Sequence, residues 1–291
     1  MLKGLFLLLS SAFLFALSTV FAKLVTGSSN ISGIEVTFFR FLLGFIIFTP
    51  LIIIKKISLK PKMPKYILLR VFFNTIAVIC FFMGIQYSTV SKANMLNMTY
   101  PVFVFLISPL ITGEKPVAWK YIYLLITMLG LYFIIMPGTG AFAFQNINKG
   151  DALALMSGVL AGFAISYLRQ SRKYDESYVI LFYLMALGFL INLFIVIPYF
   201  IMPTGMILIF ILLSAASAVL GQVCITVGYK YIDASAGSLV SSSRILFAVL
   251  LGITIFNDPL SSNIIIGGIL ILISLAGVSG VFTKKTPKEY N

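Results

Sequence analysis

A single arginine, Arg244, stands in an otherwise uncharged stretch of the chain, SLVSSSRILFAVLLGI at residues 238–253. A guanidinium group stays charged in proteins and presents planar, paired donors that match a carboxylate or a phosphate. Because Arg244 lies about ten residues into this apolar run, its side chain would be strained to reach water at either end. The residue therefore predicts either a binding site for an anionic group or a structural pair with a carboxylate or helix carbonyls.

Other polar side chains fall within the apolar runs, and we expect several of them to contact the same bound molecule. Pro101 removes the backbone donor that the carbonyl of Asn97 would have in a regular helix, so it predicts a kink at membrane depth. The alternative is that some of these side chains only hold helices together. Besides Arg244, the candidates for hydrogen bonding are Asn94, Asn97, Tyr100, Gln222, Ser238 and Ser242, and those for stacking or capping are Tyr87 and Tyr167.

Four further charged residues are candidates for a gating or structural role. Arg40 follows Glu35 by five residues, so the two could pair, and a contact between Arg40 and the bound molecule is equally possible. Lys23 and Arg70 lie nearer to the ends of their apolar runs. Long basic side chains at such positions can extend to the lipid headgroups.

Several function classes are excluded by what the sequence does not contain. The chain has no His, no Walker A sequence and no paired carboxylates, so we expect neither an enzyme, nor a metal site, nor a cofactor. Cys80 and Cys224 lie in apolar runs and are expected to pack rather than to react. The formal charge of +13 is attributed to Lys and Arg in cytoplasmic loops and not to nucleic-acid binding.

The elements that must position these residues are membrane-spanning helices. The 291 residues are 60% hydrophobic and only 10% charged, with a mean hydropathy of +1.08, which is typical of a polytopic membrane protein. A spanning helix needs about 20 apolar residues. Ten such runs fit, at 4–25, 33–54, 66–88, 92–112, 119–137, 151–171, 177–199, 205–229, 235–256 and 262–282.

The distribution of Lys and Arg predicts the orientation of these helices. If the N-terminus is placed inside and the runs alternate, fifteen basic residues fall in inside segments and only Lys92 and Lys149 fall outside. Basic residues are enriched in cytoplasmic loops. Both termini are therefore expected in the cytoplasm of a bacterial cell, with the chain as a multi-pass protein of the inner membrane.

The two halves of the chain resemble each other at an offset of 144 residues. CFFMGIQYSTVS at 80–91 aligns with CITVGYKYIDAS at 224–235, although two apolar chains can match by chance. We predict two repeats, 1–140 and 146–283, followed by a cytoplasmic tail at 284–291. An odd number of helices in each repeat would insert the second one upside down, an architecture typical of secondary transporters.

The polar residues follow the same relation between the halves. They concentrate in the first, third and fourth runs and in the corresponding sixth, eighth and ninth runs, while the other four runs are mostly apolar. We therefore expect an all-α membrane protein of ten transmembrane helices, as two inverted five-helix repeats. A central cavity would lie between the six polar helices.

Short motifs at corresponding places resemble the drug/metabolite transporter superfamily, EamA type. These are FFRF at 38–41 and the turns GEKP at 113–116 and NDP at 257–259, with Glu114 and Asp258 as the acidic positions. The resemblance implies a ten-helix monomer that moves small metabolites by alternating access. More narrowly, EVTFFRF at 35–41 and the arrangement from Ile232 through Arg244 to Asp258 are similar to S-adenosylmethionine uptake transporters, although the serines at 241–243 depart from that pattern.

These observations together predict a secondary transporter of a small carboxylate-bearing metabolite, such as an amino acid or S-adenosylmethionine, with Arg244 on the carboxylate. Its partners would be this metabolite and membrane lipids, with no nucleic acid, and a monomer is favoured. The alternatives are a carrier or flippase of a lipid-linked substrate, an exporter of drugs or other metabolites, and a membrane scaffold that transports nothing.

Overall fold

The apolar runs fold as helices because a backbone in lipid must satisfy its hydrogen bonds within its own segment. A computed structural model describes residues 2–88, 90–135, 148–256 and 262–279, and all regular secondary structure in these ranges is helical. The predicted turn at Asp258, the boundary between the repeats at 140–146 and the tail at 284–291 lie outside the described residues. The helices are α1 (Leu2–Ser28), α2 (Gly33–Ile54), α3 (Pro64–Tyr87), α4 (Val90–Asn97), α5 (Tyr100–Thr112), α6 (Ala118–Ile135), α7 (Lys149–Tyr174), α8 (Ser177–Val196), the 3-10 helix η1 (Ile197–Tyr199), α9 (Gly205–Gly228), α10 (Ala234–Ser241), α11 (Arg244–Phe256) and α12 (Ser262–Val278).

Each predicted run contains helix, but two of the runs are interrupted. Within the described residues, seven segments are long and apolar enough to cross a membrane: α1, α2, α3, α7, α9, α8 together with η1, and α10 together with α11. The helices α5, α6 and α12 are apolar but shorter. The run predicted at 92–112 is divided into α4 and α5, and the run predicted at 235–256 is divided into α10 and α11.

The two interruptions occupy equivalent places in the halves of the chain. α4 ends at Asn97 and α10 ends 144 residues later, at Ser241. α5 begins at Tyr100 and α11 begins 144 residues later, at Arg244. The break between α4 and α5 lies just before Pro101, the second residue of α5, and confirms the predicted kink. Arg244 is therefore the first residue of a half-helix, and not, as expected, a residue in the middle of a continuous one.

The second interruption arises without a proline. The hydroxyl of Ser242 donates to the carbonyl of Ser238, and such side-chain bonds compete with the regular helical pattern. The backbone N–H groups of Ser243 and Ile245 bond three residues back, to Val240 and Ser242, which tightens the chain at this point. A run of serines thus breaks α10 from α11 where proline breaks α4 from α5.

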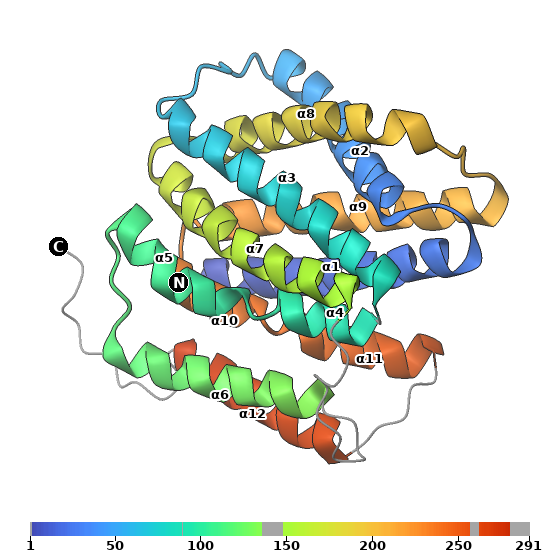
Figure 1. The fold of residues 1–291 in the computed structure, drawn as a ribbon. Helices are drawn as coiled ribbons and strands as arrows, with labels where there is room; N and C mark the ends of the chain where they lie inside the picture. The colour runs from blue at the N-terminus through green and yellow to red at the C-terminus, as the bar shows by residue number, and fades with distance from the viewer. Residues whose placement is uncertain (1, 89, 136–147, 257–261, 280–291) are drawn as a thin grey trace.

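The packing of the helices also relates the two halves (Figure 1). α1 packs along α9 as α7 packs along α3, and α1 contacts α11 as α7 contacts α5. α2 packs against α8, and α6 packs against α12 at the edge of the bundle. The first two pairs of contacts are therefore related by exchange of the two halves, and the contacts of α2 with α8 and of α6 with α12 are each their own counterpart.

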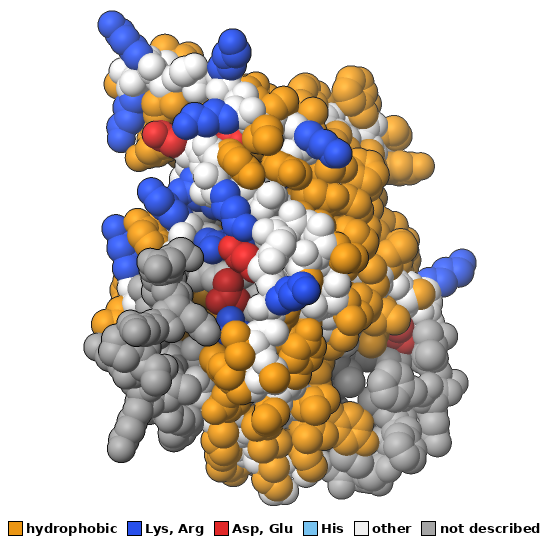
Figure 2. Space-filling model, turned by 90° about the vertical axis from the view of Figure 1, so that its left-hand side faces the viewer, with side chains coloured by type: hydrophobic (Ala, Val, Ile, Leu, Met, Phe, Trp, Pro, Cys, Tyr) orange, Lys and Arg blue, Asp and Glu red, His pale blue; other side chains and the backbone are white. Residues whose placement is uncertain are grey.

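Positive charge gathers at one end of the bundle. The segments 55–63, 113–117, 175–176 and 229–233 meet at this end, on the left in Figure 1. Figure 2, which faces it, shows Lys and Arg side chains with a few Asp and Glu among them, bordered by hydrophobic side chains. We refer to it as the charged end.

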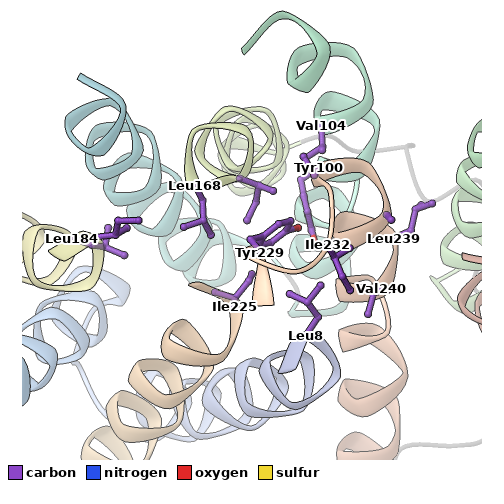
Figure 3. Close-up of a cluster of buried hydrophobic side chains, with 14 of the residues drawn as sticks. Leu8, Tyr100, Val104, Leu168, Leu184, Ile225, Tyr229, Ile232, Leu239 and Val240 are labelled. Carbon is purple, nitrogen blue, oxygen red and sulfur yellow. The ribbon is translucent and has the colours of Figure 1, made fainter. Parts of the chain in front are cut away.

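A hydrophobic layer lies between the charged end and the centre of the bundle (Figure 3). Tyr229 is fully buried in it, together with Leu8, Leu168 and Leu239 from three other helices. A Cβ atom at Gly237 would lie 2.5 Å from the ring of Tyr229, so only glycine leaves room for this ring. We refer to these side chains as the tyrosine plug.

We predict that the contact between α6 and α12 depends on Gly267. A Cβ atom there would lie 2.4 Å from the carbonyl oxygen of Gly130, so Gly267→Ala should force the helices apart and destabilise the protein by roughly 1–3 kcal/mol. The measurement is the melting temperature of the purified protein in detergent. Gly268→Ala is the matched control, because its Cβ would meet Leu246 at an ordinary 3.6 Å. Equal melting temperatures for the two variants would contradict this packing.

Candidate binding cavity

A cavity of about 120 Å³, large enough for several water molecules, lies at the centre of the bundle. Its walls come from α1, α3, α4, α5, α7, α9, α10 and α11, with Arg40 contributed by α2. These are the helices of the six polar runs, with the addition of α2. Both helix interruptions contribute to the wall, through Asn97 and Tyr100 on one side and Ser241 and Arg244 on the other.

Arg244 is positioned by hydrogen bonds from two other helices. Its Nη2 donates to the hydroxyl of Thr19 at 3.0 Å and to the amide oxygen of Asn94 at 3.2 Å. Its guanidinium carbon lies 5.0 Å from the centroid of the Phe81 ring, a favourable cation–π distance. Neutral groups thus orient the guanidinium, but they do not neutralise it.

Two further arginines line the same cavity. The Nη2 of Arg40 donates to the side-chain oxygen of Gln222 at 3.0 Å, and its guanidinium carbon lies 5.3 Å from the centroid of the Phe15 ring. Arg70 is 2% exposed and is among the largest fully buried side chains of the described chain. The Nε atoms of Arg40, Arg70 and Arg244 are buried and find no hydrogen-bond partner among the residues that the structure describes. The cavity therefore concentrates positive charge and unused donors.

The structure brings four of the predicted contact residues to the wall of the cavity. These are Arg244, Asn97, Tyr100 and Gln222. Asn97 donates from its amide to the hydroxyl of Ser157 at 2.8 Å, and the Tyr100 hydroxyl donates to the carbonyl of Ser238 at 3.2 Å. Asn94 is buried behind the wall, where it holds Arg244.

The other predicted contacts lie away from the cavity. Ser238 and Ser242 are fully buried, and their hydroxyls donate to carbonyls of their own segment, so they shape the helix interruption. Tyr87 is 54% exposed at the far end of α3. Tyr167 stacks on Phe73 with ring centroids 5.7 Å apart. The prediction that these four residues contact the bound molecule does not agree with the geometry.

The charged residues assigned to gating or structure are distributed differently from the expectation. Glu35 does not pair with Arg40 within the described chain; it caps α2 by accepting from Ser32 and also accepts from the backbone of Ile201. Arg70 lies in the cavity and not at the headgroups. Lys23 lines a separate pocket near Gln86, at the end of α1 opposite the charged end.

The sequence analysis does not single out three aromatic residues of the wall, Phe15, Phe81 and Phe82. Two of them, Phe15 and Phe81, lie beside Arg244. Each lies against the guanidinium of Arg244, with ring centroids 6.0 and 5.0 Å from its central carbon. With 27 Phe in the chain, the sequence carries no signal that singles out these two.

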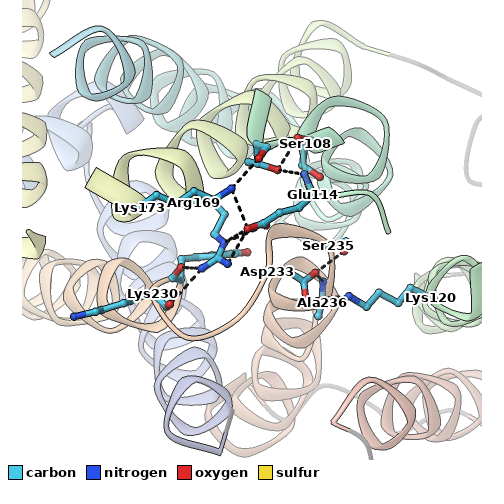
Figure 4. Close-up of polar contacts among 11 residues, drawn as sticks. Ser108, Glu114, Lys120, Arg169, Lys173, Lys230, Asp233, Ser235 and Ala236 are labelled. Carbon is cyan, nitrogen blue, oxygen red and sulfur yellow. Dashed lines mark hydrogen bonds and ion pairs between the residues drawn. The ribbon is translucent and has the colours of Figure 1, made fainter. Parts of the chain in front are cut away.

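A polar network closes the bundle at the charged end (Figure 4). Arg169 donates from Nε and Nη2 to the carboxylate of Glu114, at 3.1 and 2.8 Å, and from Nη1 to the carbonyl of Tyr229 at 2.8 Å. Lys173 forms a second ion pair with Glu114 at 3.1 Å. The network joins α7, the segment after α5 and the segment after α9.

A separate ion pair fixes the start of α10. Asp233 accepts from the Lys120 ammonium at 2.9 Å, from the N–H of Ala236 and from the Ser235 hydroxyl. Burial raises the pKa of the Asp233 carboxyl, but Lys120 and the two hydrogen bonds outweigh it and hold the pKa below its usual value. The ionised form is thus the one that the fold stabilises.

The model of the EamA-like transporter family matches this chain twice, over residues 2–136 and 148–280. The pseudopaline exporter CntI of Pseudomonas aeruginosa strain UCBPP-PA14 is 24% identical over 95% of this chain and 96% of its own length. The S-adenosylmethionine uptake transporter of Rickettsia prowazekii is 21% identical over 84% of this chain and 82% of its own. A solved crystal structure superposes with a TM-score of 0.79 at 15% identity, covering 98% of this chain and 99% of that one, so the fold is shared.

We predict that the ion pair of Asp233 makes the stability of the protein sensitive to acid. Folding lowers the pKa of the Asp233 carboxyl. The ion pair therefore stabilises the protein fully above the pKa of an unfolded Asp, about 4, and this stabilisation is lost as the pH falls through the pKa of the folded state. Asp233→Asn keeps a capping side chain but removes the charge. Its melting temperature should be lower than that of the parent at pH 7, and the difference should narrow below about pH 4.

The control is Glu176→Asn, which removes an exposed carboxylate at the charged end. A difference between Asp233→Asn and the parent that stays constant from pH 7 to pH 3 would contradict the assignment of the low pKa.

Proposed function

Because the chain belongs to the EamA-like transporter family, we propose that it carries a small carboxylate-bearing organic metabolite across a membrane by alternating access. An amino acid or an amino-acid derivative is the class expected. The chain is a multi-pass membrane transporter and not an enzyme. Its relatives include both an exporter and an uptake carrier.

Two inverted repeats of five spans, 1–140 and 146–283, are the proposed architecture. The family model matches the two halves separately, and the helix interruptions fall at the same offset in both. In this interpretation α4 with α5, and α10 with α11, each form one interrupted span, which makes ten. Interrupted helices that face each other across a central site are a feature of inverted-repeat transporters.

Arg244 is the residue to which we assign the carboxylate of the substrate. The observation that carries the proposal is its position: it begins a half-helix, faces a central cavity, and within the described residues its hydrogen-bond partners are the neutral side chains of Thr19 and Asn94. The positive end of the α11 dipole adds to the attraction for an anion. Asn97, Tyr100 and Gln222 would hydrogen-bond the other polar groups of the substrate.

Alternating access requires that the cavity open to one side at a time. Toward the charged end, two groups of side chains lie beyond the cavity: the tyrosine plug and the network of Glu114 with Arg169. We propose that both groups separate when the transporter opens to that side. The excess of Lys and Arg there supports the assignment of this side to the cytoplasm of a bacterial inner membrane. We propose that the protein acts as a monomer.

We predict that Arg244→Ala weakens substrate binding about 10- to 100-fold, the effect of losing a hydrogen bond between charged groups. A thermal-shift screen of the purified protein against amino acids, other organic acids, nucleosides and S-adenosylmethionine first identifies a ligand, whose affinity and transport are then measured in proteoliposomes. Arg244→Lys should recover only part of the affinity, because it keeps the charge but loses the paired donors.

The control is Lys65→Ala, which removes an exposed cation far from the cavity. Undiminished transport by a folded Arg244→Ala protein would rule out the assigned role.

We also predict that Glu114 keeps the charged end closed. Glu114→Gln removes the charge that holds both Arg169 and Lys173, so the closed state should become less populated. A reporter cysteine at Ala161, in the cavity wall, is introduced after Cys80 and Cys224 are replaced by alanine. Its labelling by a membrane-impermeant maleimide from the charged end should be faster with Glu114→Gln than with the exposed-residue control Glu176→Gln. Equal labelling rates would contradict the gate.

A further inference from the structure

The cavity carries more positive charge than one carboxylate can neutralise. We propose that its substrate is a small organic acid with at least two ionised acid groups, and not a zwitterion or a cation. This inference rests on the proposed function, namely that the cavity binds a small carboxylate-bearing metabolite, and it replaces the amino-acid class expected there with a diacid.

Three guanidinium groups, those of Arg40, Arg70 and Arg244, line the same cavity. Arg40 and Arg244 both lie against the ring of Phe15, at 5.3 and 6.0 Å from its centroid. Arg40 is also close enough to both Arg244 and Arg70 for the like charges to repel each other. Like charges at such separations in a medium of low dielectric oppose the folded state unless something neutralises them.

None of the described acidic side chains supplies that neutralisation, because none of them lines the cavity. Glu35 caps α2, and Asp175 accepts from the backbone of Lys62 and Met63. Asp151 caps α7. Glu114 and Asp233 form their ion pairs at the charged end. The described carboxylates are thus used at the ends of helices, and the counter-charge of the three arginines is left to a bound molecule.

The backbone adds to the positive potential. α5 and α11 both begin at the cavity wall, so the positive ends of two helix dipoles lie beside the same space. Half-helix N-termini at the centre of a membrane are suited to anionic groups. This contribution is independent of the three side chains and has the same sign.

The arrangement suits two acid groups on a short carbon skeleton. Arg244 would hold one group, and Arg40 would hold the other with Arg70 beside it. The skeleton between them would lie against Phe15, the ring that Arg40 and Arg244 share. A zwitterion would bring an ammonium group into a positive cavity, and S-adenosylmethionine would bring both an ammonium and a sulfonium against a single carboxylate. The charge of the cavity therefore disfavours S-adenosylmethionine as the substrate.

The test compares ligands of similar size and different charge on the purified full chain in nanodiscs of uncharged lipid. Glutarate, glutamate and glutamine form one series, with 3-phosphoglycerate, inorganic phosphate and S-adenosylmethionine added. We expect the rise in melting temperature to follow negative charge, with glutarate and 3-phosphoglycerate above glutamate, and with no rise from glutamine or S-adenosylmethionine. The rise should diminish in high salt.

Two results would overturn the inference in distinguishable ways. Binding of glutamine or S-adenosylmethionine at least as tight as that of the dianions would overturn the charge assignment but leave the carrier of a carboxylate-bearing metabolite intact. An absence of binding by every organic acid in this series and in the wider screen would overturn the proposed function, and the charge assignment with it.

The arginine variants add a readout that does not need the natural substrate. Without ligand, Arg40→Gln and Arg70→Gln should melt at the same temperature as the parent or above it, because each removes a buried like charge. Arg40→Gln should also lower the preference for dianions over monoanions about tenfold, the effect of one hydrogen bond to a charged group. A marked fall in melting temperature for both variants would show that the arginines hold the fold together, and would overturn the inference.

Discussion

Positive charge buried at membrane depth is the constraint on which the rest of this structure depends. A single arginine at the centre of a spanning helix costs about 2.5–3.5 kcal/mol even on the lowest scales. Three of them face one space here, and none of the described residues that line it is a carboxylate. They are tolerable because that space admits water or a ligand, and because Thr19, Asn94 and Gln222 supply neutral acceptors. The small and polar side chains of the cavity wall are therefore a consequence of the arginines.

The interrupted helices follow from the same constraint. Backbone that leaves the helical pattern is tolerated inside a membrane only where it lines a cavity or is buried in protein. The two interruptions meet this condition, although Pro101 produces one and the serines at 241–243 produce the other. Since the chemistry differs and the position is the same, the position is the feature that the cavity requires. Each interruption begins a half-helix whose positive end adds to the field of the arginines.

The sequence predicts well where each residue lies along its helix, and poorly toward which side of the helix its side chain points. Charge counts, run lengths and the offset of 144 residues place the helices, the kink at Pro101 and the depth of Arg244. They do not distinguish Ser238, which bonds within its own segment, from Ser241, which reaches the cavity. In a soluble helix the apolar face reveals which side is buried, but in lipid the outer face is also apolar, so this signal is weak. For the same reason the sequence does not show that Arg70 faces the cavity.

The position of the tyrosine plug suggests how binding and opening are coupled. Leu8, Leu168 and Tyr229 lie about one helical turn from Ser11, Ile165 and Ile225, which line the cavity on the same helices. A ligand that draws the arginines together would shift these helices and therefore the plug as well. A ligand favours opening only if it binds the open arrangement more tightly than the closed one. An anionic ligand can have different affinities for the two arrangements because it neutralises the repulsion among the three guanidinium groups. The free energy gained in this way depends on how close together the helices hold these groups.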